Sequence, residues 1–145
     1  MTTLTQSAYL VGQTLKEMLL ADVSLGLHRV FYGDISKVGA TPCATVEPGT
    51  KERTHRGTGL WMEIIIPVSI MVYYARIEGE EQLISESDAF VERIESTIHT
   101  EPMKTLGGLI VHGWIHRVEP GTAIRAGARL RAHRISWRGI SRAHI

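Results

Sequence analysis

The stretch LWMEIIIPVSIMVYYA, residues 60–75, decides the fold because apolar side chains occupy every second position in it. From Leu60 to Tyr74 every even-numbered residue is apolar, whereas the odd positions mix polar and apolar residues. Side chains of a strand point alternately to the two faces of its sheet, so this period predicts a strand whose even face is buried. The stretch exceeds an ordinary strand in length and contains Pro67. It therefore predicts one long bent strand, or two strands broken near that proline.

Residues upstream of this stretch predict a helix and two shorter strands. Apolar residues recur at helical spacing over residues 4–21, which predicts an amphipathic helix. Residues 25–32 and 44–47 each predict a strand that ends at a turn. Residues 50–58 are polar and without a pattern, so we predict an exposed loop there.

Residues downstream predict a second helix and a hairpin. Residues 81–99 predict a helix with carboxylates on its outer faces. Its apolar stripe consists of Phe90, Val91, Ile94 and Ile98. Residues 109–118 and 123–137 predict two strands, joined by a turn at residues 119–122 (EPGT). The apolar positions in the second strand change parity near His133 and Arg134, which predicts a β-bulge there.

The order of these elements is helix, two strands, long strand, helix and hairpin. This order predicts a single α+β domain over residues 1–145, with a mainly antiparallel sheet flanked by two α-helices. We find no internal repeat, low-complexity stretch or linker that would indicate a second domain.

Composition narrows the class of protein. The chain has 145 residues, a mass of 16.1 kDa, 43% apolar and 21% charged residues, and a formal net charge of +1. These values are typical of a globular domain and argue against a polyelectrolyte that binds nucleic acid by charge alone. The single cysteine, Cys43, excludes an internal disulfide framework. No apolar run is long enough to predict a membrane span, and the N-terminus does not resemble a signal peptide. The sequence therefore predicts a soluble protein of a reducing compartment, with no membrane partner.

The charges are distributed unevenly along the chain. Residues 1–116 hold 9 basic and 14 acidic residues, whereas residues 117–145 hold 7 arginines and only Glu119 as an acid. The acids concentrate between Glu78 and Glu101, over the predicted second helix. Two oppositely charged segments can pair with each other, pair with neighbouring copies, or simply be solvated faces of a monomer.

Residues with catalytic potential form no recognisable motif. His112 and His116 lie four apart in a predicted strand, which separates them by ~13 Å, too far for one metal ion. Cys43 lacks a partner motif and is predicted to be a buried structural thiol. Gly107 and Gly108 do not belong to a phosphate-binding glycine pattern. We therefore predict no catalytic, cofactor-binding or metal-binding residues, and no enzymatic activity.

The arginines are the strongest candidates for binding. Arg125, Arg129 and Arg131 are predicted to share one face of a strand, and further arginines follow at Arg134, Arg138 and Arg142. Such a row could follow a nucleic-acid backbone, with Trp137 and His133 adding stacking. Pairing with carboxylates is the favoured alternative, because the planar guanidinium suits them. The candidate subunit interface therefore comprises Arg125, Arg129, Arg131, Glu86, Glu92 and Glu95.

The arrangement resembles the tail terminator proteins of long-tailed bacteriophages, also called tail completion, minor tail or neck-type proteins. The resemblance covers nearly the whole chain and rests on the order and spacing of its segments. These are an N-terminal helix, HRVFYGD (residues 28–34), CATVEPGT (43–50), a polar loop, LWMEIIIPVSIMVYYA (60–75), SDAFVERIESTI (87–98) and a hairpin with an arginine-rich last strand.

The resemblance implies a virion structural protein with a twisted, mainly antiparallel sheet flanked by helices. Such a protein forms a homohexameric ring at the head-proximal end of the tail tube, stops polymerisation of the major tail protein and presents a surface to the head-completion or connector protein. It would assemble in the host cytoplasm. No cofactor is implied. Residues 48–59 are expected to face the lumen or an adjacent ring, where Arg53, His55 and Arg56 could transiently contact DNA.

Two alternatives remain open from the sequence. Other head–tail connector or completion proteins of the virion are similar in size and are easily confused with terminators. A nucleic-acid-binding domain is the remaining alternative, and it predicts an affinity that falls steeply with salt.

Overall fold

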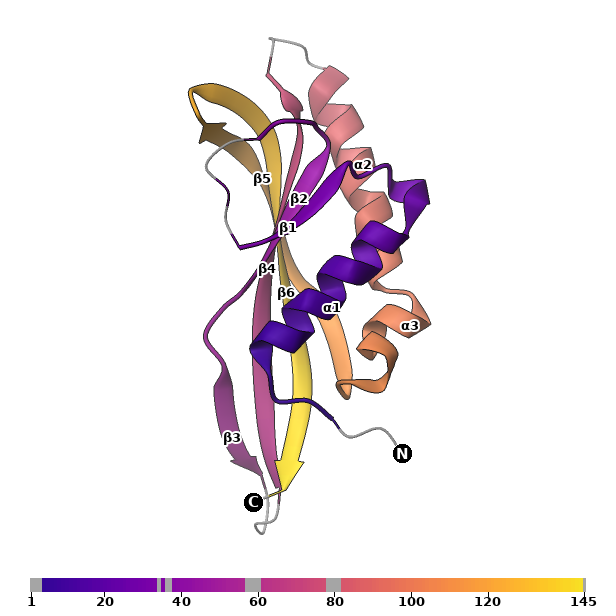
Figure 1. Cartoon of the computed structure of the whole chain (residues 1–145), viewed down its shortest axis with the longest axis vertical. Helices are drawn as coiled ribbons and strands as arrows, with labels where there is room; N and C mark the ends of the chain where they lie inside the picture. The colour runs from indigo at the N-terminus through magenta and orange to yellow at the C-terminus, as the bar shows by residue number, and fades with distance from the viewer. Residues whose placement is uncertain (1–3, 34, 36–37, 57–60, 78–81, 145) are drawn as a thin grey trace.

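The computed structural model describes residues 4–33, 35, 38–56, 61–77 and 82–144. The chain forms a single α+β domain in which all helices lie on one side of a twisted sheet (Figure 1). The helices are α1 (Ala8–Ala21), α2 (Gln82–Ile98) and the short α3 (Glu101–Lys104), with 3₁₀ turns η1 (Val23–Leu25) and η2 (Leu106–Gly108). The strands are β1 (Arg29–Tyr32), β2 (Cys43–Pro48), β3 (Glu52–Arg56), β4 (Trp61–Arg76), β5 (His112–Arg125) and β6 (Ala128–His144).

The sheet is mainly antiparallel, as predicted. Its strand order is β1-β2-β4-β6-β5, and β3 pairs with β4 beyond the end of β2. Among the strands of the described residues, only β1 and β2 pair in parallel. Strands β4 and β6 form the centre of the sheet, and β5 is an edge strand.

The central strand β4 confirms the period-two prediction. Its even-numbered side chains from Ile64 to Val72 are at most 2% exposed and pack against the helices. The strand is continuous through Pro67, so the alternative of two broken strands is wrong. The Pro67 carbonyl accepts a hydrogen bond from Gly49 N–H at 2.8 Å, at the place where β2 has ended and β3 has not begun. The missing N–H of Pro67 points toward this same gap, so no ladder hydrogen bond is lost.

The two long helices confirm the predicted apolar stripes. In α2, Phe90, Val91, Ile94 and Ile98 are at most 3% exposed. Helix α1 begins later than predicted, because Ser7 caps it by accepting a hydrogen bond from Leu10 N–H. Gly12 lies directly against Pro48 and Tyr32, which allows α1 to approach the sheet closely.

Two predictions upstream of β4 need correction. The strand predicted at residues 25–32 is shorter, because Val23–Leu25 form a 3₁₀ turn and β1 begins at Arg29. The polar loop predicted at residues 50–58 is partly strand β3, which pairs with β4 from Glu52–Ile65 to Arg56–Trp61. Edge strands can be polar on both faces since only their backbone pairs, and so β3 carries no apolar period. Residues 57–60 lie outside the described part of the chain.

The hairpin turn lies further along the chain than predicted. It is formed by Ala126 and Gly127, with φ of 51° and 79°, between Arg125 and Ala128. Two consecutive positive φ angles are the mark of a type I′ turn. The predicted turn residues 119–122 continue strand β5 instead. Pro120 is tolerated there because β5 is an edge strand.

The predicted bulge near His133 is also wrong. Strand β6 runs without a register shift, and the bulges lie in β4 after Tyr73 and in β5 after Ile115. The apolar residues of β6 change from even to odd positions because opposite faces of the strand are buried in its first and second halves. Leu130 and Ala132 belong to a small cluster opposite the helices, whereas Ile135 and Trp137 belong to the main core beneath them.

Candidate interaction surface

The arginines predicted to form one row are separated in the structure. Because the turn is at Ala126 and Gly127, Arg125 belongs to β5 and lies on the side of the sheet opposite Arg129 and Arg131. Its guanidinium donates a hydrogen bond to the Tyr73 hydroxyl at 3.0 Å and lies 5.4 Å from the centre of that ring. Arg129 is exposed. The prediction that these three arginines share a face is therefore wrong.

Arg131 pairs with α2 of its own chain. Its Nε donates to Ser87 Oγ at 3.1 Å, and its Nη2 lies 3.5 Å from Asp88 Oδ1. His133 Nε2 lies 2.8 Å from the same carboxylate oxygen. Ser87 and His133 are buried, so this cluster fixes the first half of α2 on β6. The predicted pairing of arginine with an acid thus occurs within one chain at Asp88, a residue that the candidate set did not include.

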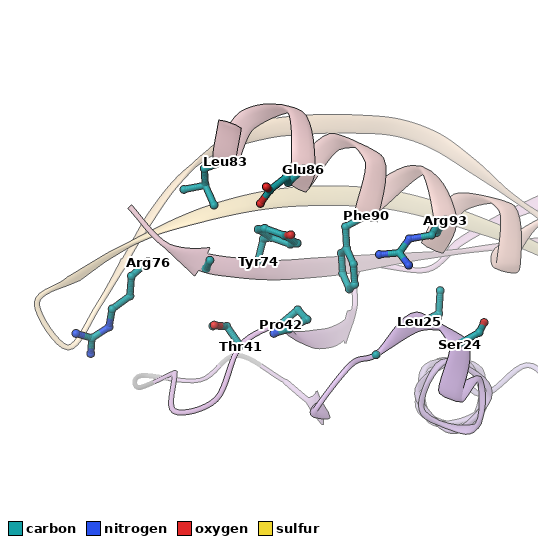
Figure 2. A pocket seen from close by; sticks show the side chains of 12 residues that line it. Ser24, Leu25, Thr41, Pro42, Tyr74, Arg76, Leu83, Glu86, Phe90 and Arg93 are labelled. Carbon is teal, nitrogen blue, oxygen red and sulfur yellow. The ribbon is translucent and has the colours of Figure 1, made fainter. Parts of the chain in front are cut away.

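The three acids of the candidate interface occupy different environments on α2. Glu92 is exposed, Glu95 is half-buried, and Glu86 lines a hollow of about 560 Å³. Figure 2 shows Phe90 pointing from α2 toward the side of the hollow that carries Pro42, with Glu86 above Tyr74 and Arg93 beside Phe90. Glu86 therefore lines the same hollow as Arg76 and Arg93, whereas Glu92 is exposed elsewhere on α2.

The outer surface of α2 is hollowed around Glu92. A depression of about 720 Å³ is lined by Ile84, Ser85, Asp88, Ala89 and Glu92, and we call it the α2 groove. Ile84 is 51% exposed and is one of several large hydrophobic side chains on the described surface. The α2 groove therefore combines exposed apolar surface with two carboxylates, of which Asp88 already contacts Arg131 and His133 of the same chain.

The residues expected to face a lumen lie on strand β3. Arg53 and His55 are exposed and pair with Ile64 and Met62, so they share the side of the sheet on which the helices lie. Arg56 pairs with Trp61 at the end of the same strand. The three residues thus occupy one edge strand at one end of the molecule, at the bottom of Figure 1.

Three arginines that the candidate interface did not include share an exposed face. Arg134, Arg138 and Arg142 occupy alternate even positions of β6, on the side of the sheet opposite the helices. Trp114 is the cross-strand neighbour of Arg138. Its ring stacks on the ring of His112, and the two ring centres are 5.8 Å apart. We call this region the open face, defined by Ile65, His112, Trp114, Arg134, Arg138 and Arg142. The parity of these arginines, opposite to Ile135 and Trp137, is the sequence feature that could have identified them.

Carboxylates are interspersed with the arginines of the open face. Glu63 pairs across strands with Arg142, and Glu119 with Arg134. Glu119 also lies 3.3 Å from Arg117. The central Arg138 is different, because its cross-strand neighbours are Pro67 and Trp114. Positive charge on this face is therefore least compensated at Arg138.

Other features of the described residues add little chemistry. Cys43 is buried as predicted, and burial raises the pKa of its thiol. His112 and His116 both lie on β5, and the described residues contain no group of three His, Cys, Asp or Glu side chains able to hold a metal ion. None of the described helices has the length and apolar character needed to cross a membrane. Neither a scan against protein-family models nor a search of the curated proteins gave a match to this sequence.

Proposed function

We propose that this protein is a virion structural protein of a long-tailed bacteriophage, the tail terminator. It forms a homohexameric ring at the head-proximal end of the tail tube, stops polymerisation of the tube and provides the surface for head–tail joining. The proposal is supported by the resemblance described above. The order of helix, short strands, long strand, helix and hairpin on which that resemblance depends is also the order of elements in the fold.

The observation that carries the proposal is the presence of two unlike surfaces on opposite sides of one sheet. The α2 groove, on the helix-covered side, is acidic and partly apolar. The open face, on the other side, carries exposed arginines and a half-buried tryptophan. Identical copies close into a ring through contacts between two different surfaces of each copy, and this domain has such a pair.

The partners and location follow from the proposed role. The ring would contact the major tail tube protein on one side and the head-completion or connector protein on the other, in the virion and, before that, in the host cytoplasm. Strand β3 extends beyond the helices and exposes Arg53 and His55. The Arg53 guanidinium, with His55 on the same side of the strand, suits transient contact with DNA that passes through the lumen.

A nucleic-acid-binding domain is the second candidate function. The stacked His112 and Trp114 beside exposed arginines favour it, because bases stack on aromatic rings while phosphates pair with guanidinium groups. The carboxylates of Glu63 and Glu119 on the same face disfavour it, since they repel a phosphate backbone.

Imaging by negative-stain electron microscopy tests the proposal. The purified protein is examined alone and after incubation with tubes assembled from the major tail protein of the same phage. We expect six-fold rings whose mass by light scattering is about six times 16.1 kDa, or caps at one end of each tube. Tubes that remain uncapped and continue to grow, with the protein monomeric, would contradict the terminator function.

A further inference from the structure

We infer that the open face around Arg138 binds the α2 groove of a second copy of this chain, with Arg138 paired to Glu92. This contact rests on the proposed function, in which copies of the chain meet in a ring. It replaces the arginine set expected from the sequence, because Arg131 already pairs with Asp88 of its own chain and Arg125 contacts Tyr73.

The surroundings of Arg138 are those of a protein-binding surface. The side chain is exposed between Trp114 and Pro67, and Ile65 and Ile140 are only half-buried nearby. Arginine and tryptophan are enriched where proteins meet, because each combines a broad apolar surface with polar groups that bond specifically. Within the described residues, Arg138 forms no ion pair.

The α2 groove has the complementary composition. Glu92 is exposed and forms no ion pair with any described residue, while Ile84 and Ala89 beside it expose apolar surface. This shallow, open depression places apolar side chains beside a carboxylate, so it can contact an arginine together with the apolar side chains that flank that arginine. Charge complementarity therefore selects a second copy of this chain as the occupant.

The fold excludes the same contact within one copy. Helix α2 packs on the side of β6 that carries Ile135 and Trp137, whereas Arg138 points to the opposite side. Glu92 and Arg138 of one chain thus face away from each other. A contact between unlike faces is heterologous, so it produces a ring when the rotation between copies closes.

Nucleic acid is the less favoured occupant. Glu63 and Glu119 place negative charge at both ends of the arginine row, beside Arg142 and Arg134. A phosphate backbone would meet these carboxylates, whereas a protein surface of mixed charge can avoid them.

Charge reversal tests the pairing. Arg138→Glu and Glu92→Arg should each weaken self-association by about tenfold or more, because each places like charges at every contact between copies. The double variant R138E/E92R should restore association, and so should an equimolar mixture of the two single variants. In that mixture every contact can join a carboxylate to an arginine. Sedimentation velocity on the full chain measures the association.

Matched controls separate the pairing from a general effect of charge. Arg129→Glu and Glu17→Arg reverse exposed charges elsewhere on the described surface and should leave association unchanged. All four single variants change exposed side chains, so their melting temperatures should equal that of the wild type. If the wild type associates only on tail tubes, capping of tubes replaces sedimentation as the readout.

The outcomes distinguish this contact from the proposed function. Rings or caps that persist in both single variants would overturn the contact and leave the terminator function standing. Wild-type protein that neither associates nor caps tubes would overturn both. Unchanged assembly of Arg138→Glu together with lost binding to a double-stranded DNA oligonucleotide would assign the open face to nucleic acid instead.

Discussion

Trp137 is fully buried in a space that two glycines create. Gly113 on β5 and Gly139 on β6 are cross-strand neighbours, and a Cβ atom on either would overlap the indole ring. At Gly139 the nearest indole atom would lie 2.6 Å away. These glycines are therefore required for close approach of the ring and not for an unusual backbone angle.

Replacing Gly113 with alanine should destabilise the domain. The added methyl group overlaps Trp137, and overpacking of this kind costs about 1–3 kcal/mol. For a domain of this size that corresponds to a fall in Tm of about 2–12 °C, measured by circular dichroism. Gly121→Ala on the same strand is the control, since nothing lies within 4 Å of its Cβ position. Equal melting temperatures for the two variants would contradict this account of the tryptophan site.

Asp22 links the end of α1 to α2 through a pH-sensitive contact. Hydrogen bonds from Ser24 and Thr97 hold the pKa of Asp22 below its ordinary value of 3.8. A lowered folded-state pKa means that the carboxylate stabilises the fold above pH 3.8 and that this stabilisation is lost as the pH falls through the folded pKa. Asp22→Asn should therefore be less stable than the wild type at pH 7. The difference in urea midpoint should shrink below pH 3.8, and a difference that grows there would contradict the assignment.

The β5–β6 turn contains a residue poorly suited to its backbone. Ala126 adopts φ of 51°, which is strained for any residue with a Cβ, and asparagine tolerates this conformation better. Ala126→Asn should therefore raise stability by about 1 kcal/mol, or Tm by about 2–4 °C. Gly127→Ala, at φ of 79°, should lower Tm instead. Thermal melts of both variants check the turn type, and a stabilising Gly127→Ala would contradict it.

The buried face of β4 should not accept a charge. Ile66 is 0% exposed beneath the helices, so Ile66→Asp places a carboxylate among the apolar side chains of the main core. The cost of several kcal/mol approaches the total stability of a typical domain, and we expect the variant to be unfolded by circular dichroism. Thr54→Asp, on the exposed strand β3 beside it, should fold normally. Native-like melting of Ile66→Asp would show that the face is not buried.

Self-association of the whole molecule should weaken with salt. The surfaces that we propose to meet carry opposite charges at exposed positions. Salt weakens such attraction, because the Debye screening length falls from ~10 Å at 0.1 M salt to ~3 Å at 1 M. The association constant from sedimentation velocity should fall as sodium chloride rises from ~0.1 to ~1 M. A contact held by apolar burial alone would hold or strengthen under these conditions.

The regular elements with one buried face were predictable from the sequence. The even positions of residues 60–74 predict the central strand, and the stripe from Phe90 to Ile98 predicts α2, because burial of one face imposes a period on the side chains. The failures share the opposite property. The described side chains of strand β3 are exposed, and the turn has alanine at residue 126, where asparagine, aspartate or glycine is preferred before Gly127, so neither leaves a recognisable pattern.

The residues of the candidate site could not be predicted from the spacing of residues within one segment of the sequence. The sequence by itself determined the fold class, the central strand, the second helix and the separation of acidic from basic segments. Only the tertiary structure decided which arginines face outward. Because the turn is at Ala126 and Gly127 and not at residues 119–122, Arg125 lies on the other side of the sheet, and α2 lies over Arg131 but not over Arg138. Alternation along a strand assigns side chains to two faces, but packing between distant segments determines which face is covered.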